Sequence, residues 1–312
     1  MHRIGYLLTD GFQMLALGTQ SIFEFANGVL EQPYYLVEQY AMQAGGVRSS
    51  MGVTVACKAI GEAGRLDTLM VLGVTDPLGN PTPADLADYL RHANIWRRVA
   101  GICTGAFTLA EAGLLDGRRV TTHWAYGRML QQRHPHASVE EDRIYMVDGP
   151  VWTSAGMTAG LDLALALVEK DLGNEVARTV AHKMVMHQRR AGGQTQHSEL
   201  LQLSPKSDRI QNVLSYARKN LHRAVSVEEL ADSANLSPRQ FSRVFTAETG
   251  QSPAKALEGL RLEAARLMIE QSRHPLEIIA RETGFRDRRH LREAFVRGFG
   301  VAPQSLRREA RV

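Results

Sequence analysis

The chain has 312 residues, with 37 lysines and arginines against 33 aspartates and glutamates and a formal net charge of +4. This length is enough for two domains with cores of their own. Two cysteines, Cys57 and Cys103, exclude a disulfide-stapled fold, and no stretch is apolar enough to cross a membrane. The sequence runs from Met1 straight into a strand-like pattern with no signal peptide, so we expect a cytoplasmic protein.

Strand and helix patterns alternate along the first 190 residues. The predicted strands cover residues 3–8, 34–43, 52–55, 67–73, 98–102, 120–122, 144–147 and 151–153. The predicted helices cover residues 12–27, 83–95, 106–112, 156–170 and 173–190. Such alternation indicates a flavodoxin-like α/β sandwich with a mostly parallel sheet, whose ligands bind beyond the carboxyl ends of the strands.

One strand-to-helix turn in this region carries a Gly-Ile-Cys-Thr-Gly pattern at residues 101–105. Glycines two residues to either side of a cysteine are typical of the nucleophile elbow, here with cysteine in place of serine. A thiol at the start of a helix lies where the helix dipole favours a thiolate or a bound anion. His123 follows another predicted strand and is expected at the same edge of the sheet. We therefore interpret Cys103, Thr104 and His123 as candidate effector-binding residues.

Three interpretations of Cys103 stay open from the pattern alone. The side chain is a catalytic nucleophile, part of a ligand site, or a small buried group in a turn. A cysteine needs a neighbouring base or a depressed pKa to act as a nucleophile, and His123 is the one candidate base that the pattern offers.

Charge is distributed unevenly along the chain. From residue 205 onward there are 20 lysines and arginines against 13 acidic residues, and residues 1–204 hold the remaining 17 against 20. A basic excess confined to the carboxyl-terminal part is typical of a nucleic-acid-binding domain. A polar run precedes that part, so we predict domains at 1–190 and 207–312 that are joined by a linker at 191–206.

The last hundred residues contain two versions of one unit, the second 49 to 50 residues after the first. Each version has a short apolar-periodic helix, then a turn with Asn235 or Gly284 where a left-handed backbone is needed, then a second helix. Ser237 and Pro238 are a cap and a first helical residue in one copy, and Asp287 is the cap in the other. The predicted helices here include 238–248, 253–271 and 287–298.

The second helix of each unit has one apolar and one polar face. Phe241 and Phe245 lie four residues apart, as do Leu291 and Phe295, and each pair predicts a buried stripe. The opposite faces are rich in arginine, which pairs with guanine edges and phosphates in a planar fork, so these helices are suited to a major groove. The candidate DNA-binding residues are Arg239, Gln240, Ser242, Arg243, Arg288, Arg289 and Arg292.

Two such units joined by a long helix, with the ending that runs from Gly284-Phe285 to Pro303, resemble the AraC/XylS transcription regulators over residues 207–308. The resemblance implies that the two second helices dock in successive major grooves of promoter DNA. Family members are more often activators, which act on RNA polymerase. This chain departs from the family at Glu293, where an arginine is common. A glutamate there can accept a hydrogen bond from a cytosine amino group or hold a neighbouring arginine.

The run from Cys103 to Trp124 resembles the PfpI-like branch of the class I glutamine-amidotransferase-like fold, in the form that precedes AraC-type domains, and the resemblance spans about 3–195. PfpI-like proteases have a histidine directly after the nucleophile, where this chain has Thr104. Hydrolases and glyoxalases of the fold use a glutamate from the first βα segment, where residues 13–18 contain no acid. We therefore expect no catalytic residue and no enzyme.

The sequence therefore predicts a transcription regulator in which an α/β domain senses a small molecule or a partner and dimerises the protein. The expected partners are double-stranded promoter DNA, a second copy of the chain and, for an activator, RNA polymerase. No phosphate-binding loop, dinucleotide fingerprint or metal-ligand spacing is present, so no cofactor and no metal are predicted. The alternative is a cysteine-dependent hydrolase or glyoxalase-type enzyme that is localised by its basic domain.

Overall fold

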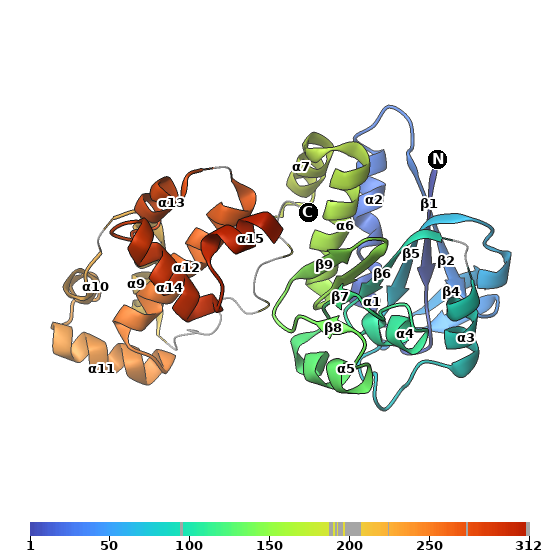
Figure 1. Cartoon of the computed structure of the whole chain (residues 1–312), viewed down its shortest axis with the longest axis horizontal. Coiled ribbons are helices and arrows are strands. Elements are labelled where there is room, and N and C mark those ends of the chain that lie inside the picture. Colours follow the sequence, from blue (N-terminus) through green and yellow to red (C-terminus); the bar gives the residue numbers. More distant parts are fainter. Residues whose placement is uncertain are drawn as a thin grey trace. The chain divides into compact units, whose positions relative to one another are not determined.

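The computed structural model describes residues 1–93, 96–186, 190, 192, 196, 207–223, 225–272 and 274–309. The chain divides into two compact units, Met1–Gly192 and Gly193–Val312 (Figure 1). The predicted linker at 191–206 lies almost wholly outside the described residues, so the domain limits given from the sequence stay a prediction.

A sheet with the strand order β3-β4-β2-β1-β5-β6-β10-β9 forms the centre of the described part of the amino-terminal unit. Pairing is parallel from β4 through to β10 and antiparallel at both edges, where β3 pairs with β4 and β9 pairs with β10. A short parallel pair, β7 and β8, lies outside this sheet. The strands are β1 His2–Leu7, β2 Tyr35–Ala41, β3 Gly45–Arg48, β4 Thr54–Ala59, β5 Leu66–Leu72, β6 Trp96–Ile102, β7 Arg119–Val120, β8 Ser138–Val139, β9 Tyr145–Asp148 and β10 Val151–Ser154.

Helices cover both faces of the large sheet (Figure 1). One core packs α1, α2, α6 and α7 on one face, and a second core packs α3, α4 and α5 on the other. The helices are α1 Met14–Leu17, α2 Gln20–Asn27, α3 Ala84–His92, α4 Gly105–Glu111, α5 Gly127–Arg133, α6 Met157–Leu172 and α7 Asn174–Lys183. The predicted flavodoxin-like α/β sandwich is therefore confirmed, and both faces of its central strands are buried as parallel sheets require.

Three predicted elements are wrong in detail. The helix expected at 12–27 is two helices, because Gly18 N and Thr19 N bond carbonyls three residues back and interrupt the α-helical pattern there. The strand expected at 52–55 is the turn and the start of β4 in a β3–β4 hairpin, since Gly52 has a φ of +84°. The helix expected at 173–190 ends at Lys183, and Val185 just beyond it has a φ of +54°.

The carboxyl-terminal unit consists of helices in its described residues. These are α9 Asp208–Lys219, α10 Val227–Ser233, α11 Pro238–Thr249, α12 Pro253–Gln271, α13 Leu276–Glu282, α14 Arg288–Phe299 and α15 Pro303–Glu309. The long helix α12 begins and ends where the sequence predicted, and α11 and α14 do so within one residue. Within the described ranges, no helix is long and apolar enough to span a bilayer.

Two small cores share α12. Its first half contributes Ala256 and Leu260 to a core with α9, α10 and α11, and its second half contributes Ala265 and Ile269 to a core with α13, α14 and α15. Each helix-turn-helix thus has a hydrophobic core of its own, and the single long helix fixes the two cores to each other.

Candidate nucleic-acid interface and ligand site

The first helix-turn-helix runs from α10 through a tight turn into α11. Asn235 has a φ of +54°, the left-handed backbone that the sequence predicted for this turn. The Ser237 hydroxyl accepts a hydrogen bond from Gln240 N at 3.4 Å, and the Gln240 side chain accepts one from Ser237 N at 3.3 Å. This capping box satisfies backbone groups at the start of α11. The Gln240 amide therefore has a structural contact besides any role on DNA.

The outward face of α11 is basic. Phe241 and Phe245 are fully buried, as predicted, and the exposed side chains of Arg239 and Arg243 lie four residues apart on the opposite side of the helix. Neither guanidinium forms an ion pair with any residue that the structure describes. Ser242 is half-buried at the edge of this face. The first helix-turn-helix thus presents two guanidinium groups whose hydrogen-bond donors are available to a ligand.

The second helix-turn-helix has the same geometry with a different turn residue. Gly284 has a φ of +74°, and a Cβ atom there would lie 2.2 Å from Leu221 O, so glycine is required for both reasons. Asp287 caps α14, because its carboxylate accepts a hydrogen bond from His290 N at 2.7 Å. Leu291 and Phe295 are buried. Both predicted caps and both predicted stripes are confirmed.

The outward face of α14 differs from that of α11 in its ion pairs. Arg288 bonds Glu277 on α13 at 3.2 Å, and Arg289 bonds Glu293 at 2.8 Å. Arg292 is exposed and has no ion pair among the described residues. The Arg289 hydrogen bond holds the pKa of Glu293 below its ordinary value. Of the two uses that the sequence left open for Glu293, the structure shows the one in which it holds a neighbouring arginine.

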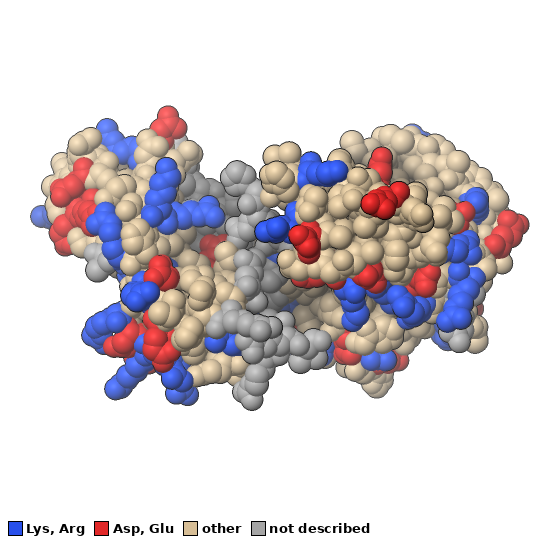
Figure 2. Space-filling view, turned by 90° about the horizontal axis from the view of Figure 1, so that it is seen from above, with Lys and Arg blue, Asp and Glu red and all other residues tan. Residues whose placement is uncertain are grey.

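Charges of both signs are interspersed on the carboxyl-terminal unit. Figure 2 shows blue and red side chains side by side on the visible face of this unit, which is on the left. Arg297 on α14 bonds Glu258 on α12 at 2.5 Å, and Arg223 bonds Glu229 on α10 at 2.5 Å. Several arginines of this unit thus have an acidic partner, which lowers the local net charge and fixes the orientation of the guanidinium.

The predicted elbow is present in the amino-terminal unit at the carboxyl end of β6. Cys103 has a φ of +56°, which is strained for a residue with a side chain. A Cβ atom at Gly105 would lie 2.3 Å from Val71 O, so the turn requires glycine there to approach β5. Thr122 Oγ1 donates to Cys103 O at 2.9 Å and ties the elbow to the segment that follows β7.

Cys103 is only 1% exposed. Burial raises its pKa to about 11, although hydrogen bonds from Thr104 and Gln13 oppose that shift. Gln13 comes from the first βα segment, where enzymes of this fold carry a glutamate, and sequence reasoning missed it. Its amide is neutral and cannot serve as a base. The raised pKa and the neutral amide both disfavour the thiolate that a nucleophilic cysteine requires.

A small hollow of about 70 Å³ lies at the same carboxyl ends of the strands. Thr104 lines it and donates to Val74 O at 2.5 Å, while Cys103 and His123 are not among the described residues that line it. Asp10 is the charged group among these lining residues. The wall is made of Thr9, Asp10, Val74, Pro77, Asn80, Pro81, Thr82, Pro83, Thr104, Phe107 and Thr108.

His123 lies at the start of a short 3₁₀ helix, Trp124–Tyr126, and its ring accepts a hydrogen bond from Ala125 N at 3.3 Å. The ring is half-exposed and lies 5.5 Å from the Trp124 ring, centroid to centroid. Of the three predicted residues, Thr104 lines the hollow, Cys103 is buried in the elbow, and His123 follows Thr122, which bonds the elbow backbone. Their role in binding an effector stays a prediction.

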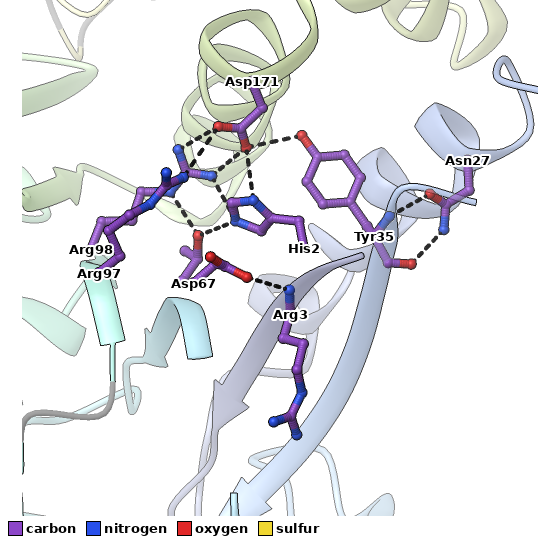
Figure 3. Close-up of polar contacts among 9 residues, drawn as sticks. His2, Arg3, Asn27, Tyr35, Asp67, Arg97, Arg98 and Asp171 are labelled. Carbon is purple, nitrogen blue, oxygen red and sulfur yellow. Dashed lines mark hydrogen bonds and ion pairs between the residues drawn. The ribbon is translucent and has the colours of Figure 1, made fainter. Parts of the chain in front are cut away.

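A buried ionic cluster lies at the opposite end of the strands, near the starts of β1, β5 and β6 (Figure 3). Arg98 on β6 bonds Asp171 on α6 through both ends of its guanidinium and donates to Thr68 Oγ1 at 2.7 Å. His2 on β1 contacts Thr68 Oγ1 at 3.0 Å, and Tyr35 on β2 donates to Asp171 at 3.1 Å. Arg98 and the Asp171 side chain are each about 5% exposed, so this cluster fastens α6 to the sheet rather than meeting a ligand.

The described residues contain no group of three or more side chains placed to hold a metal ion.

Comparisons with known proteins match both units. A family model described as a helix-turn-helix domain matches residues 230–309, and one described as the DJ-1/PfpI family matches residues 23–170. The HTH-type transcriptional regulator GlxA of Rhizobium meliloti is 31% identical over 99% of this chain and 97% of its own length. An isonitrile hydratase of Pseudomonas putida is 43% identical, but over 27% of this chain and 36% of the hydratase.

Among solved structures, an AraC family transcriptional regulator from Pseudomonas putida has a TM-score of 0.53 at 21% identity, over 59% of this chain and 100% of that one. It supports the fold. A DJ-1/PfpI-type domain followed by two helix-turn-helix units defines a DNA-binding transcription regulator. The chain belongs to the AraC/XylS-type regulators that carry an amino-terminal DJ-1/PfpI domain. The predicted family and function are confirmed.

Proposed function

We propose that α11 and α14 enter neighbouring major grooves of promoter DNA and read sequence there. In this arrangement Arg239, Ser242 and Arg243 contact base edges from α11, with Gln240 beside them. From α14, Arg288, Arg289 and Arg292 contact bases and phosphates. The observation that carries the proposal is the pair Arg239 and Arg243, both exposed, four residues apart, and directly opposite the buried phenylalanines of the same helix.

Arg243→Ala tests this assignment. The variant should lose about 1–3 kcal/mol of binding free energy on the preferred duplex and much less on a scrambled duplex of equal length. Fluorescence anisotropy at one fixed salt concentration measures both, because affinities for DNA depend strongly on salt. Equal losses on the two duplexes would show that Arg243 contacts phosphate alone.

We further propose that the hollow beside the elbow binds a small intracellular effector. Thr104 contacts the ligand directly, and Cys103 and His123 shape the edge of the sheet around it. Asp10 is the charged residue in the wall, so the ligand is neutral or cationic. Binding of amines, amino acids and sugars is measured by the fluorescence of the tryptophans, which all lie in this unit. Asp10→Asn and Thr104→Val should weaken the best ligand about tenfold or more, and a ligand indifferent to both variants binds elsewhere.

We propose that the protein does not use Cys103 for catalysis. The buried thiol, whose pKa burial raises, and the neutral Gln13 beside it support this assignment. The competing enzyme function is supported by the partial similarity to an isonitrile hydratase. An alkyl isonitrile therefore serves as the test substrate for the parent and for Cys103→Ala. We expect no turnover in either, and turnover in the parent that Cys103→Ala abolishes would establish the enzyme.

We also propose a cytoplasmic homodimer that activates transcription through contact with RNA polymerase. Light scattering should give about twice the 34.6 kDa mass of the chain, and a mass of one chain would contradict the dimer. A promoter fused to a reporter should respond with higher expression in the presence of the protein, and lower expression would make the protein a repressor.

A further inference from the structure

The centre of the outward face of α14 is occupied by an ion pair. Arg289, Glu293 and Val296 follow one another at four and three residues, so they lie on one side of the helix. The buried residues Leu291 and Phe295 lie on the other side, against the core. The pair is therefore at the centre of the face that α14 would present to a groove.

The pair uses one particular nitrogen of the guanidinium. Arg289 donates from Nε to Glu293 Oε1 at 2.8 Å, and no described residue accepts a hydrogen bond from its Nη1 or Nη2. The hydrogen bond with Glu293 raises the pKa of Arg289, which therefore stays charged. A guanidinium held through Nε still presents its two terminal nitrogens as a fork, the geometry that matches O6 and N7 of guanine.

We propose that Glu293 is a positioning residue that orients Arg289 to bind the O6 and N7 atoms of a guanine in the major groove. This inference rests on the proposed function, in which α14 enters that groove. A free arginine loses the freedom of several rotatable bonds when it binds, and a partner that fixes its orientation beforehand lowers this cost. In α11 the residue that corresponds to Glu293 is Arg243. Arg239, which corresponds to Arg289, therefore has no acidic partner at that position.

The same pair explains how a carboxylate is tolerated on a DNA-binding face. A lone glutamate would repel the phosphates, but the Arg289–Glu293 pair has no net charge. With Oε1 engaged by Arg289, the carboxylate is used to hold the arginine. In the competing role, Glu293 itself accepts a hydrogen bond from a cytosine amino group. That role predicts that Glu293→Ala loses a preference for cytosine.

Selection from a randomised duplex library with the full-length protein distinguishes these roles. The parent, Arg289→Ala, Glu293→Ala and Glu293→Gln are each allowed to select their preferred sites. We expect Arg289→Ala and Glu293→Ala to lose the preference for guanine at one and the same position, by about 5- to 100-fold. Glu293→Gln should retain much of it, because the amide oxygen still accepts a hydrogen bond from Nε.

Glu258→Ala is the matched control. Glu258 lies on α12 and pairs with Arg297, which lies on α14 as Arg289 does, so the variant frees another exposed arginine of that helix. It should leave base preference unchanged at every position. The positioning role is overturned if Glu293→Ala loses a cytosine preference that Arg289→Ala keeps, or if Glu293→Ala retains the guanine preference that Arg289→Ala loses. A parent that selects no sequence at all would instead overturn the proposed function itself, so the two failures are distinguishable.

Discussion

Arg98 in the amino-terminal unit and Arg243 in the carboxyl-terminal unit are the same residue type in opposite surroundings. Arg98 is 5% exposed and shares its donors between Asp171 and Thr68, whereas Arg243 is exposed and has no ion pair among the described residues. A buried guanidinium must be paired because its desolvation is costly, and an exposed one keeps its donors available. Arginine content therefore says little about function until the partners of each guanidinium are known.

The largest effect should come from breaking the buried pair. Arg98→Met leaves Asp171 buried without its main partner and should destabilise the amino-terminal unit by about 3–5 kcal/mol. All three tryptophans, Trp96, Trp124 and Trp152, lie in that unit, so their fluorescence during urea denaturation reports its unfolding alone. Affinity for DNA under native conditions should change little.

Two variants control this result. Arg97→Met removes an arginine that is 57% exposed and 4.0 Å from Asp171, and it should cost at most about 1 kcal/mol. The double variant Arg98→Met, Asp171→Leu removes both charges and should recover much of the loss. If Arg97→Met costs as much as Arg98→Met, burial is not what distinguishes the two arginines.

A smaller effect should follow from His2 in the same cluster. Burial lowers the pKa of His2, with Asp171 and Asp67 opposing and Arg98 and Arg97 adding to the shift. The folded unit then binds fewer protons than the unfolded chain, whose histidine pKa is about 6.5. The contribution of neutral His2 to the stability of the folded unit is therefore fully present above about pH 6.5. It is lost as the pH falls toward the lower pKa that His2 has in the folded unit.

Urea denaturation at pH 7 and at about pH 5.5, followed by tryptophan fluorescence, measures this loss. His2→Gln should flatten the dependence, because a glutamine does not titrate. The carboxylates titrate mainly below about pH 4.5 and act outside this window. If the change in the free energy of unfolding between the two pH values is the same in His2→Gln, another group causes it.

The smallest effect should come from Arg292 on α14, which is exposed and has no ion pair among the described residues. Arg292→Ala should weaken binding to preferred and scrambled duplexes alike, and it should reduce the slope of log affinity against log salt by about 0.9. Anisotropy titrations at four salt concentrations give this slope. A loss confined to the preferred duplex, with an unchanged slope, would make Arg292 a base-reading residue.

Local patterns predicted the turns and caps correctly. Asn235, Ser237 and Asp287 act through neighbours within four residues, so the sequence carries their whole signal. The left-handed backbone at Gly284 was predictable in the same way, but its close approach to Leu221 O was not. The elbow at Cys103 was predictable from its glycines at 101 and 105, although the contact that requires Gly105 is with Val71 O on β5.

Contacts between distant segments were not predictable. Gln13 reaches Cys103 because β1, β5 and β6 are adjacent in the sheet, and the pattern of residues 13–18 gave no sign of this role. The Arg98–Asp171 pair joins a strand to a helix more than seventy residues later. The Arg289–Glu293 spacing allowed an ion pair or a base contact, and a side-chain position was needed to distinguish them.

Genome-wide DNA occupancy of the tagged protein tests the central claim most directly, with the parent compared with an Arg243→Ala, Arg289→Ala double variant. The account predicts discrete peaks at promoters that vanish in the double variant while its amount in the cell stays the same. Diffuse occupancy of the parent, or peaks that the double variant retains, would contradict the claim that these two helices read sequence.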